Sequence, residues 1–217
     1  TYLSANVVEE ARALRKETKE LGNIEVTNAN PYIVRNLFNG NNGAFEIEAD
    51  ITPGNSDLVG LSLFNDKEER TLVYLDLKNK RLVMDRTESG LTDFGKEAER
   101  HNIEKAAEAA GLMKGKLSQD IALNFKNDFA LATWASLSLC GTAQDLNRWK
   151  EDGQTAKEGT YHLDIFVDKC SVEVFVNGGR IAMTNLVFPT APYNNIKVWA
   201  EGGKAEVSKA KVYSLGL

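Results

Sequence analysis

The fold is decided by residues 163–179, which read LDIFVDKCSVEVFVNGG. Two apolar sets in this stretch alternate with polar or aromatic neighbours: Leu163, Ile165 and Val167, then Val172, Val174 and Val176. A period of two is typical of β-strands with one face in a core and the other in solvent. Residues 168–171 form a turn between the strands, and Asn177-Gly178-Gly179 is a strong hairpin signal leading into residues 180–184. The stretch therefore predicts three consecutive antiparallel strands.

The same alternation recurs on both sides of this stretch. Residues 45–51 alternate apolar and acidic side chains without a fault, which predicts a strand with one buried and one wet face. Residues 71–77 and 81–85 predict a hairpin, and residues 196–201 and 205–213 another, joined at Gly202-Gly203. No helix separates neighbouring strands. We therefore expect an all-β fold, a two-sheet antiparallel β-sandwich of the concanavalin or jelly-roll kind.

Two segments depart from this rhythm. Apolar residues at helical spacing predict an amphipathic helix from Val7 to Leu21, with Ser4 as its cap and Gly22 as its end. Residues 95–116 are rich in Ala, Glu and Lys, which predicts a helical excursion with Gly111 as a stop. We thus expect a linking helix at residues 1–22 and a sandwich at 23–217, with a partly helical insertion at about 91–158.

Composition excludes several classes of protein. The 217 residues carry 26 basic and 31 acidic side chains, and the formal net charge of −5 argues against nucleic acid as a partner. No apolar stretch approaches the about 18 residues that a membrane span needs. Cys140 and Cys170 permit at most one internal disulfide, and with His101 and His162 they are too few to suggest a structural metal cluster. We predict no cofactor.

Few residues invite a catalytic interpretation. Asp168 and Glu173 could form the carboxylate pair of a glycoside hydrolase. Asp168, however, begins a turn, and Glu173 lies on a strand face opposite valines, so structural roles explain both. Neither His101 nor His162 has a Gly-x-Ser-x-Gly motif near it, which leaves both as surface or packing residues.

Aromatic residues could provide a platform for sugars, because their rings stack on the apolar faces of sugar rings. The candidates are Trp134, Trp149, Trp199, Tyr32 and Tyr193. Trp134 and Trp149 belong to the predicted insertion and are the carbohydrate-binding residues that we would choose. Core packing is the alternative for each of the five.

Residues 163–179, running on to Phe188-Pro189, resemble the signature hairpin of the C-terminal β-sandwich in glycoside hydrolase family 32. That family comprises levanases, inulinases, invertases and related β-fructosidases. Residues 74–90, which read YLDLKNKRLVMDRTESG, are similar to a second part of the same module. The resemblance covers residues 22–90 and 161–217. It implies a sandwich joined to a catalytic five-bladed propeller by an N-terminal helix.

The resemblance transfers no catalytic residue. Family 32 propellers carry their nucleophile in an Asn-Asp-Pro-like motif, a stabiliser in Arg-Asp-Pro and an acid/base in Glu-Cys. The four prolines of this chain follow Asn30, Thr52, Phe188 and Ala191, so no Asp-Pro occurs, and neither cysteine follows a glutamate. We expect a non-catalytic module of a fructan- or sucrose-degrading enzyme, with a free-standing fructan-binding, lectin-like module as the alternative. An autonomous hydrolase is the least favoured hypothesis.

The resemblance also implies partners. A catalytic propeller is the first, and because the chain begins at Thr1 we expect polypeptide to precede it. A fructan or other carbohydrate is the second. The surface that meets a propeller should be partly apolar, so we expect either a homodimer or a cover formed by residues 7–21 or by the insertion. An extracellular or periplasmic location would suit the family.

Overall fold

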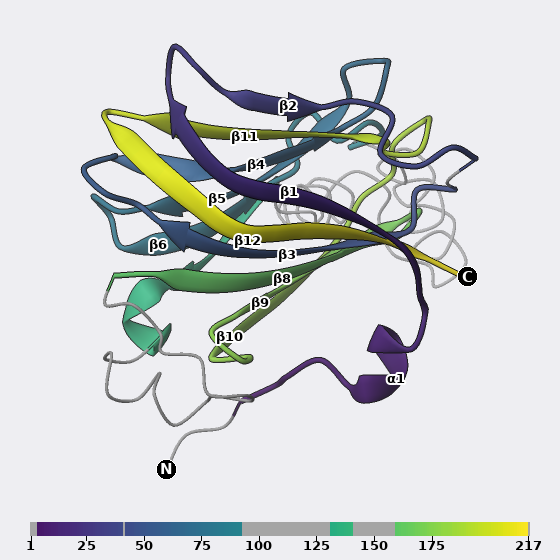
Figure 1. The fold of residues 1–217 in the computed structure, drawn as a ribbon, viewed down its shortest axis with the longest axis horizontal. Helices are drawn as coiled ribbons and strands as arrows, with labels where there is room; N and C mark the ends of the chain where they lie inside the picture. The colour runs from purple at the N-terminus through teal and green to yellow at the C-terminus, as the bar shows by residue number, and fades with distance from the viewer. Residues whose placement is uncertain (1–3, 41, 93–130, 141–158, 217) are drawn as a thin grey trace, which may run out of the picture.

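A computed structural model describes residues 4–40, 42–92, 131–140 and 159–216 of the protein. Within these residues two six-stranded antiparallel sheets pack face to face (Figure 1). The predicted all-β sandwich is therefore confirmed. None of the described helices is both long enough and apolar enough to cross a membrane.

The two sheets, A and B, are both built from strands that are far apart in the sequence. In spatial order, sheet A consists of β1 (Arg15–Thr27), β12 (Lys204–Leu215), β3 (Phe45–Thr52), β8 (Tyr161–Val167), β9 (Ser171–Val176) and β10 (Ile181–Leu186). Sheet B, in the same sense, consists of β2 (Tyr32–Val34), β11 (Asn195–Glu201), β4 (Leu58–Phe64), β5 (Arg70–Asp76), β6 (Arg81–Asp85) and β7 (Ala132–Ser136). A short helix α1 (Glu9–Arg12) and a 3₁₀ turn η1 (Leu137–Cys140) complete the described elements.

The core lies between the sheets, and alternation along each strand determines which side chains enter it. On β3 the core receives Phe45, Ile47, Ala49 and Ile51, all at most 2% exposed. Leu61 and Leu63 of β4 enter from sheet B. Fully burying such side chains contributes about 1.5–3 kcal/mol each, which makes this layer the main source of stability.

The hairpin predicted from residues 163–179 is present in the expected register. Leu163 pairs with Val176 and Val167 with Val172 across β8 and β9. Asn177, Gly178 and Gly179 all have positive φ, between 50° and 77°, as a tight turn with this handedness requires. Both cysteines are free: Cys140 is buried, which raises the pKa of its thiol to about 12, and Cys170 is exposed.

The predicted helix from Val7 to Leu21 is wrong over most of its length. Only Glu9–Arg12 is helical, its N-cap is Val8 without a side-chain hydrogen bond, and β1 begins at Arg15. Tertiary pairing outweighs local periodicity, because β1 pairs along its length with β12. Gly22 ends no helix: it has φ +74° and lies at a register shift within β1. The predicted boundary at residue 22 therefore falls inside a strand of the sandwich.

The predicted insertion at about 91–158 is described only in part. The helical excursion at residues 95–116, with His101, lies outside the described residues. Within the described part, β7 pairs with β6 along its whole length, from Arg81 with Ser136 to Asp85 with Ala132. This part of the segment therefore extends sheet B.

Candidate functional site

The outer face of sheet A carries a cluster of acidic side chains that are largely withdrawn from solvent. Glu46 and Glu48 extend from β3 and Asp164 from β8, on the side away from the core, and their oxygens lie within 4.8 Å of one another. Glu46 is 0% and Asp164 2% exposed. Charged groups are rarely buried to this degree unless they are paired. What covers and neutralises this cluster is therefore the first question about the site.

Arg15, the first residue of β1, neutralises two of these carboxylates. Its Nε donates a 2.7 Å hydrogen bond to Glu46 Oε2, and its guanidinium also contacts Glu48. Burial opposes the charge on Arg15, but the hydrogen bonds to Glu46 and Glu48 outweigh it and raise its pKa. Burial also raises the pKa of Glu46, and Arg15 opposes that shift. The Arg15 guanidinium stacks 3.8 Å from the ring centre of Tyr213, whose hydroxyl donates to Glu48.

Residues 4–14, which we call the N-terminal segment, lie along the same side of the sandwich (Figure 1). The segment is attached at both ends, since Ala5 N–H donates to Gly179 O at 3.0 Å and Gly216 N–H donates to Leu14 O at 2.9 Å. Between them, Arg12 lies 3.8 Å from Asp164. A Cβ on Gly179 would lie 2.0 Å from Ala5 O, so glycine is needed there for this approach as well as for the turn. The sequence predicts a cover from residues 7–21 over an apolar surface, whereas the N-terminal segment contacts a charged one.

His162 extends the cluster along β8. Its Nδ1 lies 2.7 Å from Asp50 Oδ1 and its Nε2 3.6 Å from Asp164 Oδ1, while Lys209 Nζ lies 3.0 Å from Asp50 Oδ2. Burial opposes the charge on His162, but the bonds to Asp164 and Asp50 raise its pKa to about 10. Burial opposes ionisation of Asp50 as well, but His162 and Lys209 outweigh it and lower the pKa of that carboxyl. The His162 side chain is 44% exposed, which agrees with the expected surface position, and the sequence did not reveal its contacts with Asp50 and Asp164.

These contacts leave the cluster little capacity for catalysis. A glycoside hydrolase needs two carboxylates facing an open site, with one free to donate a proton. In this cluster each carboxylate faces a cation of the chain. The pairs are Arg15 with Glu46 and Glu48, His162 and Lys209 with Asp50, and Arg12 with Asp164. Arg15 also binds the carboxylates of Glu46 and Glu48, two of the three groups that a metal ion at this cluster would need as ligands. We interpret the cluster as a structural ion network.

Asp168 and Glu173, the carboxylates that the sequence offers as a catalytic pair, occupy structural positions. Asp168 Oδ1 accepts a hydrogen bond from Lys169 N–H at 2.6 Å, and Asp168 N–H donates to Ser171 O at 3.0 Å. The turn explains this residue fully. Glu173 lies half-buried on β9, opposite Thr184 of β10.

The aromatic candidates differ in how far their side chains are buried. Tyr193 is 1% exposed, with its hydroxyl 2.9 Å from Thr71 Oγ1, and Tyr32 packs against the core. Trp199 is half-buried, and its ring centre lies 5.7 Å from that of Tyr74. Trp134 is 57% exposed, with the Arg81 guanidinium 4.2 Å from its ring centre. Trp149 lies outside the described residues.

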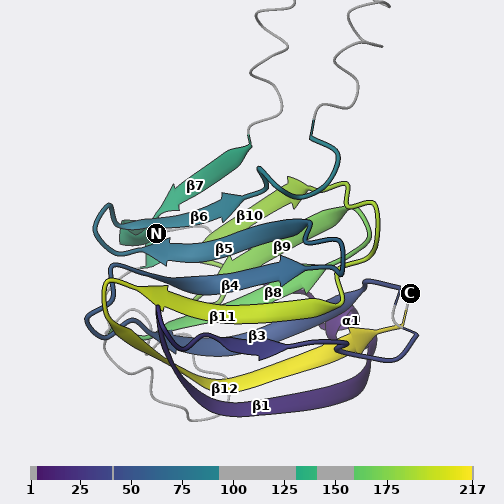
Figure 2. The same ribbon diagram turned by 90° about the horizontal axis from the view of Figure 1, so that it is seen from above.

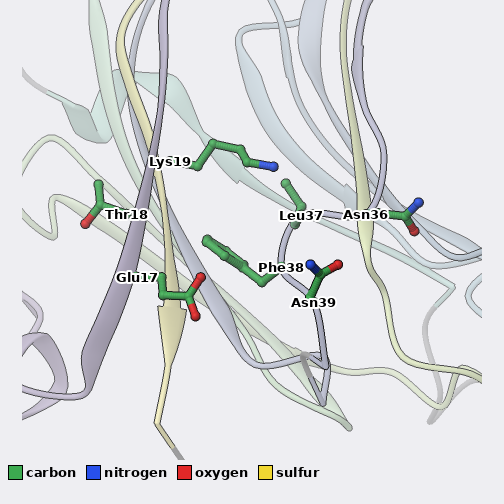
Figure 3. Close-up of a pocket in the computed structure, with 7 residues that line it drawn as sticks. All are labelled: Glu17, Thr18, Lys19, Asn36, Leu37, Phe38 and Asn39. Carbon is green, nitrogen blue, oxygen red and sulfur yellow. The ribbon is translucent and has the colours of Figure 1, made fainter.

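A hollow of about 370 Å³ lies between β1 and the loop after β2. Its lining is Glu17, Thr18, Lys19, Asn36, Leu37, Phe38 and Asn39. Figure 3 shows the Phe38 ring between Glu17 and Lys19, and Lys19 Nζ lies 5.9 Å from the ring centre. The hollow brings together one acidic and one basic side chain beside an apolar ring. It holds no pair of carboxylates suited to glycoside hydrolysis.

Comparison with known proteins places this fold in a family. The family model "Glycosyl hydrolases family 32 C terminal" matches residues 10–214. A levanase of Bacillus sp. (strain L7) is 28% identical over 184 residues, which cover 83% of this chain and 15% of that protein. A levanase of Bacillus subtilis (strain 168) is 23% identical over 211 residues, covering 96% of this chain and 24% of that protein. The chain thus spans less than a quarter of the length of these relatives.

Solved structures agree on the fold. An exo-inulinase of Aspergillus awamori superposes with a TM-score of 0.57 at 18% identity, covering 93% of this chain and 29% of that one. A fructofuranosidase of Schwanniomyces occidentalis, complexed with fructose, gives 0.61 at 15% identity, covering 94% and 34%. With a family model matched over nearly its whole length, this chain belongs to the C-terminal domain family of glycosyl hydrolase family 32.

Proposed function

We propose that this chain is a non-catalytic supporting module of a fructan- or sucrose-degrading enzyme, in which a separate catalytic domain, the chain's natural partner in family 32, performs the hydrolysis. The observation that carries the proposal is the attachment of the N-terminal segment to the outer face of sheet A. Arg12 of this segment pairs with the buried Asp164, Ala5 bonds to the turn at Gly179, and Arg15, directly after the segment, binds the buried Glu46. A polypeptide joined ahead of this segment would be anchored to a rigid sheet.

The energetics favour a fixed connection over a flexible linker. Flexible linkers are rich in glycine and serine and make few contacts with the domain that follows them. The N-terminal segment instead makes backbone hydrogen bonds near both ends and an ion pair between them. A rigid attachment of this kind would hold a catalytic domain in one orientation and oppose its local unfolding. Support of this type does not require titratable groups that face a common substrate. This agrees with the ion network, in which the carboxylates are paired with cations of the chain.

The first test is activity of the chain by itself on levan, inulin and sucrose. We expect no release of fructose. Release that is lost in Asp168→Asn or Glu173→Gln would overturn the proposal in favour of an autonomous hydrolase.

The second test replaces the matching region of the Bacillus subtilis levanase with this chain. We expect the hybrid to retain activity at temperatures where a levanase lacking that region is inactivated. Arg15→Ala in the hybrid should lower the inactivation temperature and leave KM unchanged. A hybrid no more stable than the truncated enzyme would contradict a supporting role.

The alternative of a free-standing sugar-binding module is favoured by one observation. Trp134 remains 57% exposed on sheet B, where a side chain of its size would ordinarily be covered. Trp149, the other tryptophan chosen from the sequence, lies outside the described residues. Sugar binding and support of a catalytic domain are compatible, because they would use opposite faces of the sandwich.

A further inference from the structure

The pairing of sheet B aligns aromatic residues across its outer face. Trp134 of β7 pairs with Val83 of β6, which pairs with Tyr74 of β5. Tyr74 pairs with Gly60 of β4, which pairs with Trp199 of β11. These five residues form a single row perpendicular to the strands, which we call the aromatic row. At about 4.8 Å per strand, it spans about 19 Å.

Burial along the strands shows that the row points away from the core. Leu82 and Met84, the neighbours of Val83, belong to the core, as do Val73 and Leu75 beside Tyr74. Val83 is itself only 9% exposed although it faces outward, as expected for a small side chain between two larger ones. Figure 2 looks onto sheet B, with β7, β6, β5, β4 and β11 side by side, and no other described element crosses them.

Gly60 brings the two halves of the row together. Because it has no side chain, Tyr74 and Trp199 approach each other across β4, with ring centres 5.7 Å apart and planes inclined at 50°. A Cβ at Gly60 would lie 2.4 Å from Tyr74 Cβ and 2.2 Å from Val73 O. The absent side chain at Gly60 leaves room for the two rings to come together over β4.

Charged residues flank the row on both sides. Arg81, Asp76 and Glu201 occupy the register positions on one side of it, and Asp85 lies on the other. Desolvation raises the pKa of Tyr74, and the charges of Asp85, Asp76 and Glu201 raise it further, so these carboxylates lie near its hydroxyl. Asp76 is held in place by two hydrogen bonds from Asn79, at 2.9 and 2.7 Å. The row is thus an apolar strip between fixed hydrogen-bonding groups.

The combination of an apolar strip with flanking charged groups favours some classes of ligand over others. A protein partner would have to bury the flanking charges, which interface cores avoid. A nucleic acid would bring phosphates close to three carboxylates. A neutral sugar chain can stack its apolar faces on the rings while its hydroxyl groups bond to the carboxylates and to Arg81. A platform of this length suits several linked sugar units.

We propose that the aromatic row of sheet B binds an extended β-fructan chain, with Trp134, Tyr74 and Trp199 as stacking residues. The position of the site rests on the geometry, and the choice of fructan rests on the proposed function. The face is separate from the N-terminal segment, which contacts sheet A, so a catalytic domain attached through that segment leaves the aromatic row accessible.

Isothermal titration calorimetry of the chain with levan and with inulin tests the proposal, and dextran serves as the sugar control. We expect saturable binding of at least one fructan. Trp134→Ala and Trp199→Ala should each weaken binding by about tenfold, which corresponds to about 1.4 kcal/mol, within the range of one aromatic contact. Tyr74→Phe, which keeps the ring, should retain most of the affinity that Tyr74→Ala loses.

Phe175→Ala is the matched control, because Phe175 and Phe166 form an aromatic pair, 6.1 Å apart, on sheet A. It should leave fructan binding unchanged. Circular dichroism melting of each variant separates loss of binding from loss of folding. The proposal is overturned if neither fructan binds, if dextran binds equally well, or if Trp134→Ala, at an exposed position, folds and binds like the original chain. None of these results would affect the supporting role, which is measured by the stability of a catalytic domain.

Discussion

The two outer faces of the sandwich come from strands with the same alternating sequence pattern, but their outward side chains differ in exposure to solvent. On sheet A, the outward residues Glu46 and Asp164 are at most 2% exposed, because they pair with arginines at or beside the N-terminal segment. On sheet B, the outward residue Trp134 is 57% exposed. Charge is hidden on one face and an aromatic ring is open on the other. The alternation of a strand determines which side chains leave the core, and a different part of the chain determines what covers them.

The difference in exposure between the two faces has a consequence for stability. Buried carboxylates are costly unless they are paired, and an exposed tryptophan forgoes the stabilisation that burial would give it. Sheet A therefore depends on its arginines, while sheet B carries apolar surface available for binding. Under the proposals above, the first face would hold a domain joined ahead of the N-terminal segment, and the second would bind a ligand. A substitution on one face should therefore leave the other face unchanged.

The largest effect is expected for Arg15→Ala on sheet A. The substitution leaves Glu46, which is 0% exposed, without its cation, and breaking a buried pair costs about 3–5 kcal/mol. Since the Arg15 side chain is 22% exposed, we expect a loss near the lower end, about 3 kcal/mol. Urea unfolding monitored by fluorescence measures it.

Arg70→Ala is the matched control for that experiment. Arg70 pairs with Glu88 on sheet B, and the two side chains are 49% and 58% exposed. Exposed pairs contribute about 0–1 kcal/mol, so this variant should be nearly neutral. Equal losses for the two variants would show that the pair of Arg15 with Glu46 contributes no more than an exposed pair.

The next effect is expected for Gly60→Ala on sheet B. The new Cβ would meet Val73 O at 2.2 Å and Tyr74 Cα at 2.5 Å, and these backbone atoms cannot move without disturbing the pairing of β4 with β5. Overpacking of this kind costs about 1–3 kcal/mol. The fluorescence of Trp199 should change as well, because Tyr74 would be displaced.

Gly22→Ala distinguishes this clash from the general cost of replacing a glycine. Gly22 has φ +74° but no atom within 4 Å of an added Cβ, so only backbone strain of about 1 kcal/mol is expected. A Gly60→Ala protein as stable as the original, with unchanged Trp199 fluorescence, would contradict the close approach of the two rings.

The sequence predicted the strands of the sandwich well, because alternation and turn residues are local signals. β8, β9 and β10 differ from the expected ranges by only a few residues, and the turn at Asn177 to Gly179 has the required backbone. The predicted helix from Val7 to Leu21 was wrong for the opposite reason. Its helical spacing was real, but the partner of β1 is β12, nearly two hundred residues later. Long-range pairing of this kind has no local signature.

The two faces were predictable only in part. Glu46 was expected to face solvent, and nothing near it in the sequence indicates that Arg15 would cover it. Trp134 stood out as a candidate from the sequence, but its alignment with Tyr74 and Trp199 depends on the register of five strands. The sequence did contain one indication of this arrangement at Gly60, because a glycine inside a strand often marks a place where another group approaches the backbone closely. His162 gave no sign of its charge, because Asp50 lies on a different strand.

The smallest effect is expected for His162→Gln, and its pH dependence identifies it. The pKa of His162 rises from an ordinary 6.5 to about 10 in the folded protein, with Asp50, Asp164 and Lys209 as its charged neighbours. A raised pKa means that the folded state holds a proton that the unfolded state has released. The contribution is complete below pH 6.5 and is lost as pH rises toward 10.

The measured quantity is the difference in unfolding free energy between the original chain and His162→Gln, taken at a series of pH values. Because the His162 side chain is 44% exposed, solvent screening limits the difference at about pH 6 to about 1 kcal/mol or less. It should shrink steadily from pH 6.5 to 10 and decrease in high salt. Taking the difference removes the titration of every other group that both proteins share. A difference that is constant over this range would mean that His162 contributes no charge to the ion network on sheet A.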